Sequence, residues 1–186
     1  MRSISERVEE IFSLYEKYGN RDYIGEPVSQ IEHMSQAAQM AIAGGYDDEV
    51  ILAAFFHDIG HICESQQEKN SMNGYGTKSH EMIGASYLKT LGFSEKVLSL
   101  IQSHVPAKRY LTFIDPAYYD NLSEASKQTL KFQGGVMKPQ EAKAFESHPY
   151  FKESIQLRKW DELAKEQDLP IIDLNIIKEK AKKHLS

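Results

Sequence analysis

Apolar residues recur at helical spacing along almost the whole chain, with charged residues between them. In the first segment Ile4, Val8 and Ile11 fall on one face of a helix, for which Gly19 is a suitable end. The turn-forming composition of residues 20–28 then predicts a loop. No segment sustains the alternation of apolar and polar residues that is typical of a strand. The pattern therefore predicts an all-α fold.

The same reasoning predicts further helices separated by short polar segments. We expect them over residues 29–43, 48–58, 79–91, 94–104, 122–133, 139–147, 150–167 and 171–184, with a polar loop over 64–78. Pro106 should end the helix that reaches His104, because proline cannot continue the main-chain hydrogen bonding. No repeat or linker divides the chain, so we expect one domain over 1–186. Its core is expected over 29–167, preceded by an N-terminal helix and loop over 1–28 and followed by a C-terminal helix within 168–186.

Composition and charge limit the class of protein. The chain has 186 residues, 41% of them hydrophobic, and its 22 Lys and Arg against 27 Asp and Glu give a net charge of −5. An acidic chain is a poor binder of nucleic-acid backbone. The longest apolar run, 50–56, is far shorter than the roughly 20 residues of a membrane-spanning helix. A charged N-terminal segment and the single Cys63 suit the cytosol. We expect a cytoplasmic protein without nucleic-acid or membrane partners, and the pattern indicates no particular oligomeric state.

Five of the seven histidines lie on or beside successive predicted helices: His33, His57, His61, His80 and His104. A lone histidine on an apolar helix is usually structural, but five together favour a metal site. His57 follows a strongly apolar run and is expected to face the interior, with His61 on the same helical face. Asp58 adds a carboxylate, which together with imidazole suits iron, manganese or zinc. A bound cation would also offset the cost of burying Asp58. Structural pairing of these residues is the alternative.

This arrangement of histidine and aspartate is similar to that of a known superfamily. His33, the His57-Asp58 pair and a distal aspartate resemble the HD-domain superfamily of all-α metalloproteins, and the further histidines resemble its two-metal version. Asp161 is the preferred distal aspartate because apolar residues flank it, while Asp168 lies close to Pro170, where the helix should have ended. The resemblance implies a helical bundle around a dinuclear metal site, held by His33, His57, Asp58, His80, His104 and Asp161.

Longer motifs resemble one branch of this superfamily. The segments DYIGEPVSQIEHMSQAAQ, AAFFHDIGH and SHVPAKRYL are similar to the PhnZ-type family of HD-domain oxygenases, and the similarity covers nearly the whole chain. It implies oxidative cleavage of the carbon–phosphorus bond of (R)-2-amino-1-hydroxyethylphosphonate by O₂, giving glycine and phosphate in phosphonate catabolism. It also implies two iron ions in a mixed-valent Fe(II)/Fe(III) state.

The resemblance also implies roles for residues outside the metal ligands. The residue that matches Tyr23 guards an iron position until the substrate displaces it, and the one that matches Glu26 recognises the substrate amine by a charge-assisted contact. A packed tyrosine and a solvated glutamate are the plainer alternatives. The phosphonate would be held by residues of complementary chemistry, among which Thr129 and Gln133 share the helical face of Ser126: His61, Lys108, Ser126, Thr129, Gln133 and Arg158.

Three other functions share part of this residue pattern. An HD-domain metal-dependent phosphohydrolase acting on a small phosphomonoester or nucleotide would use the same ligands without O₂, although the Tyr23 and Glu26 pair argues against it. A differently substituted aminophosphonate, such as the trimethylammonium analogue, is the nearest alternative substrate. A regulatory module with a degenerate site should lack ligands, and all six are present.

Overall fold

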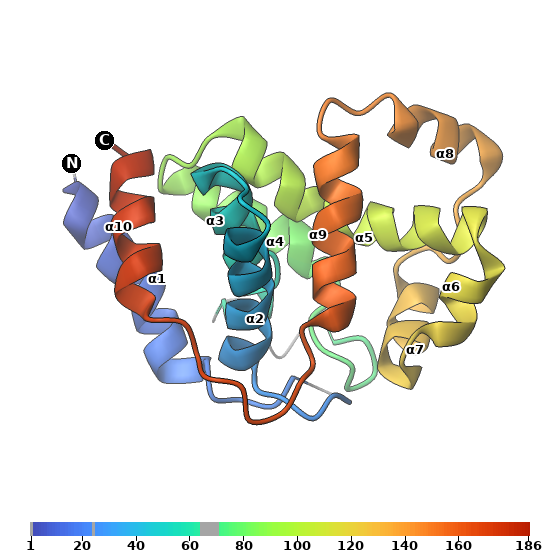
Figure 1. Cartoon of the computed structure of the whole chain (residues 1–186), viewed down its shortest axis with the longest axis horizontal. Helices are drawn as coiled ribbons and strands as arrows, with labels where there is room; N and C mark the ends of the chain where they lie inside the picture. Colours follow the sequence, from blue (N-terminus) through green and yellow to red (C-terminus); the bar gives the residue numbers. More distant parts are fainter. Residues whose placement is uncertain (1, 24, 64–70) are drawn as a thin grey trace.

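The computed structural model describes residues 2–23, 25–63 and 71–186, and their regular structure is helical. Two isolated bridges, Asp22–Ser29 and Ser71–Thr77, are the only β contacts in these described parts. The elements are α1 (Ile4–Tyr18), α2 (Gln30–Ala43), α3 (Asp48–Phe56), η1 (Ile59–His61), α4 (His80–Thr90), α5 (Glu95–Ile114), α6 (Pro116–Asn121), α7 (Glu124–Phe132), α8 (Pro139–Glu146), α9 (Phe151–Leu163) and α10 (Leu174–His184), as Figure 1 shows. The predicted all-α class is confirmed.

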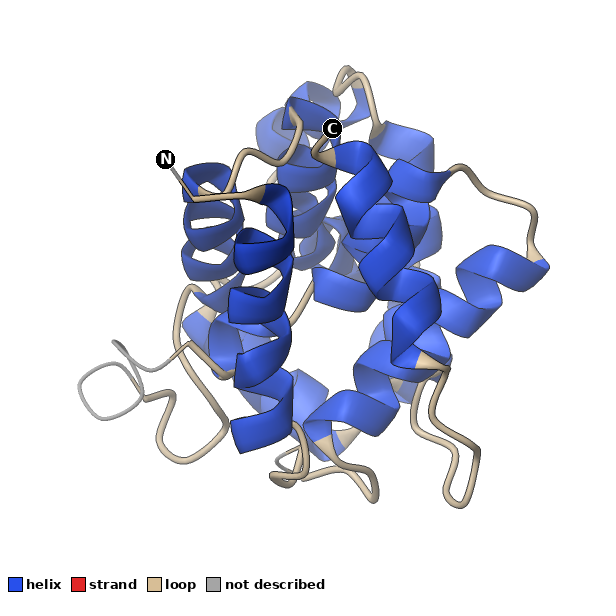
Figure 2. Ribbon diagram, turned by 90° about the vertical axis from the view of Figure 1, so that its left-hand side faces the viewer, coloured by secondary structure: helices blue, strands red, loops and turns tan. Residues whose placement is uncertain are grey.

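Helix α3 forms the centre of the hydrophobic core. Every residue of its apolar run Val50–Phe56 is buried, and the helix contacts α2, α5, α9 and α10. A helix that is apolar on all sides can be stable only when other helices surround it. Helices α1 and α10 lie side by side at one end of the molecule, so the two chain termini are close together (Figures 1 and 2). Among the described residues, no helix has the length and apolar character needed to cross a bilayer.

Capping side chains fix where the helices that carry the predicted ligands begin. Ser29 and Glu32 form a reciprocal capping box at the start of α2, which places His33 in the first turn. The Asp47 carboxylate accepts hydrogen bonds from the first main-chain N–H groups of α3. These caps satisfy donors that a helix start leaves unpaired. The start of α2, and therefore the position of His33, is set by local sequence.

The predicted end of a helix at Pro106 is wrong, because α5 runs on from Glu95 to Ile114. Proline removes one hydrogen bond to the preceding turn, but burial of residues on both sides of it, such as Val105 and Ala107, offsets that loss. The continuous helix places Lys108 one turn after His104 and on the same face. Both side chains therefore point toward the same interior region.

Other helix boundaries also differ from the prediction. Helix α6 was not expected, although Asp115 caps it and Pro116 occupies its first turn, which together form a start signal. Helix α9 ends at Leu163 rather than at residue 167, and α10 begins at Leu174 rather than near 171. Part of the predicted 64–78 loop lies outside the described residues, and the described part, 71–79, is made of turns and one bridge.

Gly60 allows η1 to pack directly against α4. A Cβ atom at this position would lie 2.0 Å from the main-chain oxygen of His80, a distance that real contacts do not reach. We expect Gly60→Ala to destabilise the fold by about 2–3 kcal/mol, because main-chain atoms must move to relieve the overlap. Urea unfolding would measure this loss. Gly45→Ala is the matched control, since its Cβ would meet no atom within 4 Å and its φ of +70° should cost about 1 kcal/mol. An equal cost at both positions would contradict the packing argument.

Candidate dinuclear metal centre

Four imidazole rings meet in two pairs inside the helical bundle. His33 Nε2 lies 3.0 Å from His57 Nε2, and His80 Nε2 lies 2.9 Å from His104 Nε2. All four rings are buried. They come from α2, the end of α3, the start of α4 and the middle of α5. The fold therefore brings together four of the histidines that the sequence predicted as metal ligands.

Main-chain carbonyls determine which nitrogen of each ring carries the proton. The Nδ1 atom of every one of these four rings lies 2.7–3.2 Å from a carbonyl oxygen. Because a carbonyl only accepts hydrogen bonds, the neutral ring holds its proton on Nδ1 and presents a lone pair at Nε2. Two buried lone pairs that face each other at about 3.0 Å repel unless a proton or a metal cation lies between them. This orientation of histidine by its second nitrogen is typical of metal ligands.

The Asp58 carboxylate lies between the two imidazole pairs. Its Oδ2 atom is 3.5 Å from both His33 Nε2 and His57 Nε2, while its Oδ1 atom is 3.1 Å from His80 Nε2 and 3.4 Å from His104 Nε2. Oδ1 is buried and has no hydrogen-bond partner among the described residues. One oxygen thus faces each pair, which is the arrangement of a carboxylate that bridges two ions.

Asp161 completes the group around the first pair. Its Oδ1 atom lies 3.4 Å from His33 Nε2 and 3.9 Å from His57 Nε2. Ligands about 2.1 Å from one metal ion lie roughly 3.0 Å apart when adjacent in an octahedron and about 3.4 Å apart in a tetrahedron. Except for the longer 3.9 Å between Asp161 and His57, the separations of 3.0–3.5 Å in this group match these values, so the residues fit a metal ion. Asp168, the competing aspartate, is exposed in the segment beyond α9 and takes no part in this group.

The carboxylates of Asp58 and Asp161 favour positive charge in this site. Burial opposes protonation of His33, but its hydrogen bonds with Asp161 and Asp58 outweigh burial and raise its pKa to about 9. Burial would likewise raise the pKa of Asp58, yet the neighbouring His57 and His80 hold that pKa well below its usual range. Two ionised carboxylates among buried imidazoles give the site a negative potential that favours divalent or trivalent cations.

A cavity of about 50 Å³ opens onto the second imidazole pair. It is lined by His80, His104 and Asp58 but not by His33 or His57. The second group also offers one carboxylate rather than two. A metal ion held there would keep more open coordination positions, and those positions face the cavity. All eight residues predicted to gate the site or to bind substrate line the same cavity: Tyr23, Glu26, His61, Lys108, Ser126, Thr129, Gln133 and Arg158.

His61 does not share a helical face with His57, contrary to prediction. Helix α3 ends at Phe56, and η1 turns the His61 ring so that it stacks on His80 with 4.0 Å between ring centroids. Its Nδ1 atom accepts a hydrogen bond from the main-chain N–H of Thr77 at 3.1 Å. Burial holds the pKa of His61 well below its usual range, so the ring is neutral and its proton is on Nε2. His61 therefore offers a donor to the cavity, whereas the four rings above offer lone pairs.

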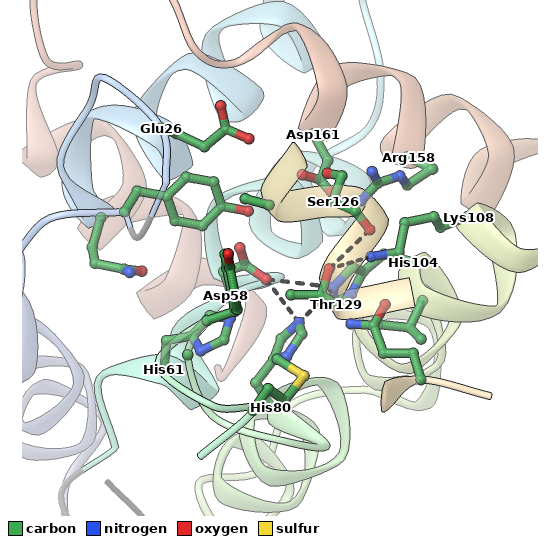
Figure 3. A pocket seen from close by; sticks show the side chains of 18 residues that line it. Glu26, Asp58, His61, His80, His104, Lys108, Ser126, Thr129, Arg158 and Asp161 are labelled. Atoms are coloured by element: carbon green, nitrogen blue, oxygen red, sulfur yellow. Dashed lines mark hydrogen bonds and ion pairs between the residues drawn. The ribbon is translucent and has the colours of Figure 1, made fainter. Parts of the chain in front are cut away.

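Two buried cationic side chains gather at one end of the cavity (Figure 3). Lys108 donates a hydrogen bond to Thr129 Oγ1 at 3.0 Å. Arg158 contacts the Asp161 carboxylate and donates from Nε to the Tyr118 hydroxyl at 2.9 Å. Burial and the nearby Arg158 hold the pKa of Lys108 well below its usual range. An anion bound between Lys108 and Arg158 would relieve the repulsion between them.

Tyr23 covers the metal-binding group from the loop before α2. Its ring stacks on His33 with 3.9 Å between centroids, and its hydroxyl hydrogen-bonds the Asp58 carboxylate. Burial and the nearby carboxylate of Asp58 raise the pKa of Tyr23 well above its usual range. The phenol therefore lies beside the carboxylate predicted to bridge two ions.

Glu26 lies at the other end of the cavity from Lys108 (Figure 3). It is reached through Gly25, whose φ of +81° and close approach to Ala125 leave no room for a side chain. The Glu26 carboxylate accepts a hydrogen bond from Ser123, the residue that caps α7, and forms an ion pair with Lys165 at 2.9 Å. The motif of Tyr23 and Glu26 thus places an anionic group opposite the two cations.

Three polar residues of this site were not predicted from the sequence. Tyr118 on α6 orients Arg158, Glu162 on α9 pairs with Arg158, and Lys165 pairs with both Glu162 and Glu26. The spacing of Arg158 and Glu162, four residues apart on one helix, was the one available signal. The contacts of Tyr118 and Lys165 join segments far apart in the chain and leave no local pattern.

Comparison with known proteins agrees with this geometry. Residues 31–143 match the model of the HD domain. An uncharacterized protein of Acanthamoeba polyphaga mimivirus is 44% identical over 89% of this chain and 75% of its own length. The [1-hydroxy-2-(trimethylamino)ethyl]phosphonate dioxygenase (glycine-betaine-forming) of Leisingera caerulea is 39% identical over 89% of this chain and 84% of its own. The hydroxymethylphosphonate dioxygenase of Gimesia maris is 37% identical over 91% and 83%. The chain therefore belongs to the HD-domain family, among members that are named phosphonate dioxygenases.

Proposed function

We propose that this protein cleaves the carbon–phosphorus bond of (R)-2-amino-1-hydroxyethylphosphonate with O₂, giving glycine and phosphate. The observation that carries this proposal is the cavity itself, which is lined by Asp58, His80 and His104 beside the metal-binding group, with two cations at one end and a carboxylate at the other. A zwitterion with a phosphonate and an ammonium group matches this distribution of charge. The reaction balances with one O₂ per substrate and needs no external electrons.

Two iron ions in the mixed-valent Fe(II)/Fe(III) state are the cofactor that we propose. His33, His57 and Asp161 would hold one ion, His80 and His104 the other, and Asp58 both. Imidazole and carboxylate ligands suit iron, and the ions would supply the redox chemistry that O₂ requires. A cytosolic location, which the single Cys63 favours, would help to keep one of them ferrous.

The remaining residues bind and orient the substrate in this proposal. Lys108 and Arg158 hold the phosphonate oxygens, and His61 donates from Nε2 to the same group. Gln133 has a buried side-chain oxygen without a partner among the described residues, which a donor on the substrate would satisfy. Ser126 and Thr129 also line the cavity and would face the bound substrate. Fixing both ends of a small molecule holds its central carbon in one place.

Tyr23 guards the metal centre until the substrate arrives. Its hydroxyl bonds Asp58 and its ring covers His33. A substrate whose hydroxyl and phosphonate oxygens approach the metal centre would have to displace the phenol. Until that displacement, the phenol would keep O₂ from reacting at the metal centre, which limits wasteful oxidation.

The phosphohydrolase alternative is less well supported by the cavity. A small phosphomonoester would bring an anion to Lys108 and Arg158 but no cation to Glu26. The trimethylammonium substrate of one relative lacks N–H donors and therefore could not hydrogen-bond the Glu26 carboxylate.

The proposal is tested by product release from iron-loaded protein with and without O₂. We expect phosphate and glycine in equal amounts, one O₂ consumed for each, and no product under nitrogen. A small phosphomonoester offered to the same protein should yield nothing. Phosphate release under nitrogen would instead establish a hydrolase, and absence of product from protein that holds two irons would reject the substrate.

Glu26→Gln should distinguish the amine from the rest of the substrate. We expect it to weaken binding of 2-amino-1-hydroxyethylphosphonate by about 10- to 100-fold, because a charge-assisted hydrogen bond is lost. Binding of 1-hydroxyethylphosphonate, which has no amine, should change much less. Calorimetric titration under nitrogen measures both constants without turnover. Equal losses for the two ligands would show that Glu26 does not recognise the amine.

A further inference from the structure

We infer that Lys165 sets how strongly the site prefers an amino-substituted phosphonate, by competing with the substrate ammonium for Glu26. This inference rests on the function proposed above. Lys165 follows α9, and its Nζ lies 2.9 Å from Glu26 Oε1. Glu26 lines the cavity and Lys165 does not, so Lys165 neutralises from behind the carboxylate with which a substrate ammonium would pair.

The ion pair is shielded from solvent. The Glu26 side chain is 8% exposed and that of Lys165 is 15% exposed. Charges that are largely removed from water interact more strongly than surface pairs. Without Lys165, the main remaining contact of the Glu26 carboxylate would be the Ser123 hydroxyl. Lys165 therefore lowers the free energy of the unliganded site and opposes entry of a second cation.

Lys165 also has a second ion-pair partner, Glu162. Its Nζ lies 3.6 Å from Glu162 Oε2, and Glu162 pairs in turn with Arg158. A chain of alternating charges thus connects the phosphonate end of the cavity to its ammonium end. When a substrate phosphonate engages Arg158, Glu162 would become available to Lys165 as an alternative partner. Lys165 would leave Glu26 only when a substrate ammonium replaces it there, so a phosphonate without an amine would leave the pair of Glu26 and Lys165 intact.

The test compares two ligands in matched variants. Dissociation constants for 2-amino-1-hydroxyethylphosphonate and 1-hydroxyethylphosphonate are measured by calorimetry under nitrogen with iron-loaded protein. We expect Lys165→Met to raise the preference for the amino ligand on the order of tenfold, as suits a shielded charge pair. Lys165→Arg keeps the charge and should leave the preference near that of the unaltered chain. In a Glu26→Gln background, Lys165→Met should have no effect on the preference.

The outcomes separate this inference from the function on which it rests. Failure of both ligands to bind the unaltered chain would overturn the proposed function and the role of Lys165 with it. Binding of both ligands with an unchanged or lowered preference in Lys165→Met would overturn only the role of Lys165. Urea unfolding of the two single variants and the double variant gives a readout that needs no ligand. Strict additivity there would show that Glu26 and Lys165 are not coupled.

Discussion

Replacing Asp58 by asparagine should reduce the iron content from two ions per chain to one or none. Asparagine keeps the size of the side chain, but it has one weak ligand oxygen and no charge. Among the described residues, Asp58 alone directs one oxygen toward the pair of His33 and His57 and the other toward His80 and His104. We expect metal affinity to fall by at least 10- to 100-fold. Elemental analysis after dialysis measures the bound iron.

Asp168→Asn is the matched control for this variant. Asp168 is exposed beyond the end of α9 and lies outside the metal-binding group. The Asp168→Asn variant should retain two irons, although it carries the same chemical change as Asp58→Asn. Two tightly held irons in Asp58→Asn would rule out a bridging role for Asp58.

Replacing Lys108 by methionine should make the protein more stable and at the same time abolish phosphonate binding. Lys108 is 3% exposed and lies near Arg158, so folding buries a cation at a cost. An apolar side chain of similar length should raise the free energy of unfolding by about 1–3 kcal/mol. Loss of the charge should weaken phosphonate binding by at least about 100-fold. Urea unfolding with and without 2-aminoethylphosphonate measures both effects.

The stability gained by Lys108→Met should depend on pH in a defined direction. The pKa of Lys108 is lowered on folding, so the unfolded chain binds the proton more tightly and the penalty exists below the unfolded pKa of about 10.4. The difference in stability between the variant and its parent should therefore shrink as the pH rises from 7 toward 10. Lys131→Met, at an exposed lysine, should show neither the gain nor its pH dependence. A loss of stability in Lys108→Met would contradict the cost assigned to this buried cation.

Local patterns were enough to predict the helices that position the metal-binding group. The predicted helix over 29–43 and the apolar run before His57 are short-range signals, and the structure adds the caps Ser29 and Asp47 that fix the starts of α2 and α3. The continuation of α5 through Pro106 was missed because packing against several helices outweighs a single lost hydrogen bond. That error mattered, since the unbroken helix is what brings Lys108 to the face that carries His104.

Contacts between distant segments explain what the sequence could not predict. The Lys165 ammonium meets Glu26 because the segment after α9 passes beside the loop before α2, as the hydrogen bond from the Gln167 side chain to the Pro27 carbonyl also shows. Tyr118 meets Arg158 from a short helix that was itself not expected. Such pairs depend on tertiary packing, which overrides local propensity. The motif of Tyr23 and Glu26 predicted an anionic group in the site but not the Lys165 ammonium that pairs with it.

X-ray diffraction at the iron absorption edge tests the dinuclear centre most directly. Crystals of iron-loaded protein should give two anomalous peaks, one among His33, His57 and Asp161 and the other between His80 and His104. Asp58 should lie between them with one oxygen toward each peak. A single peak, or two peaks that are not separated by Asp58, would contradict the account of a metal pair bridged by this carboxylate.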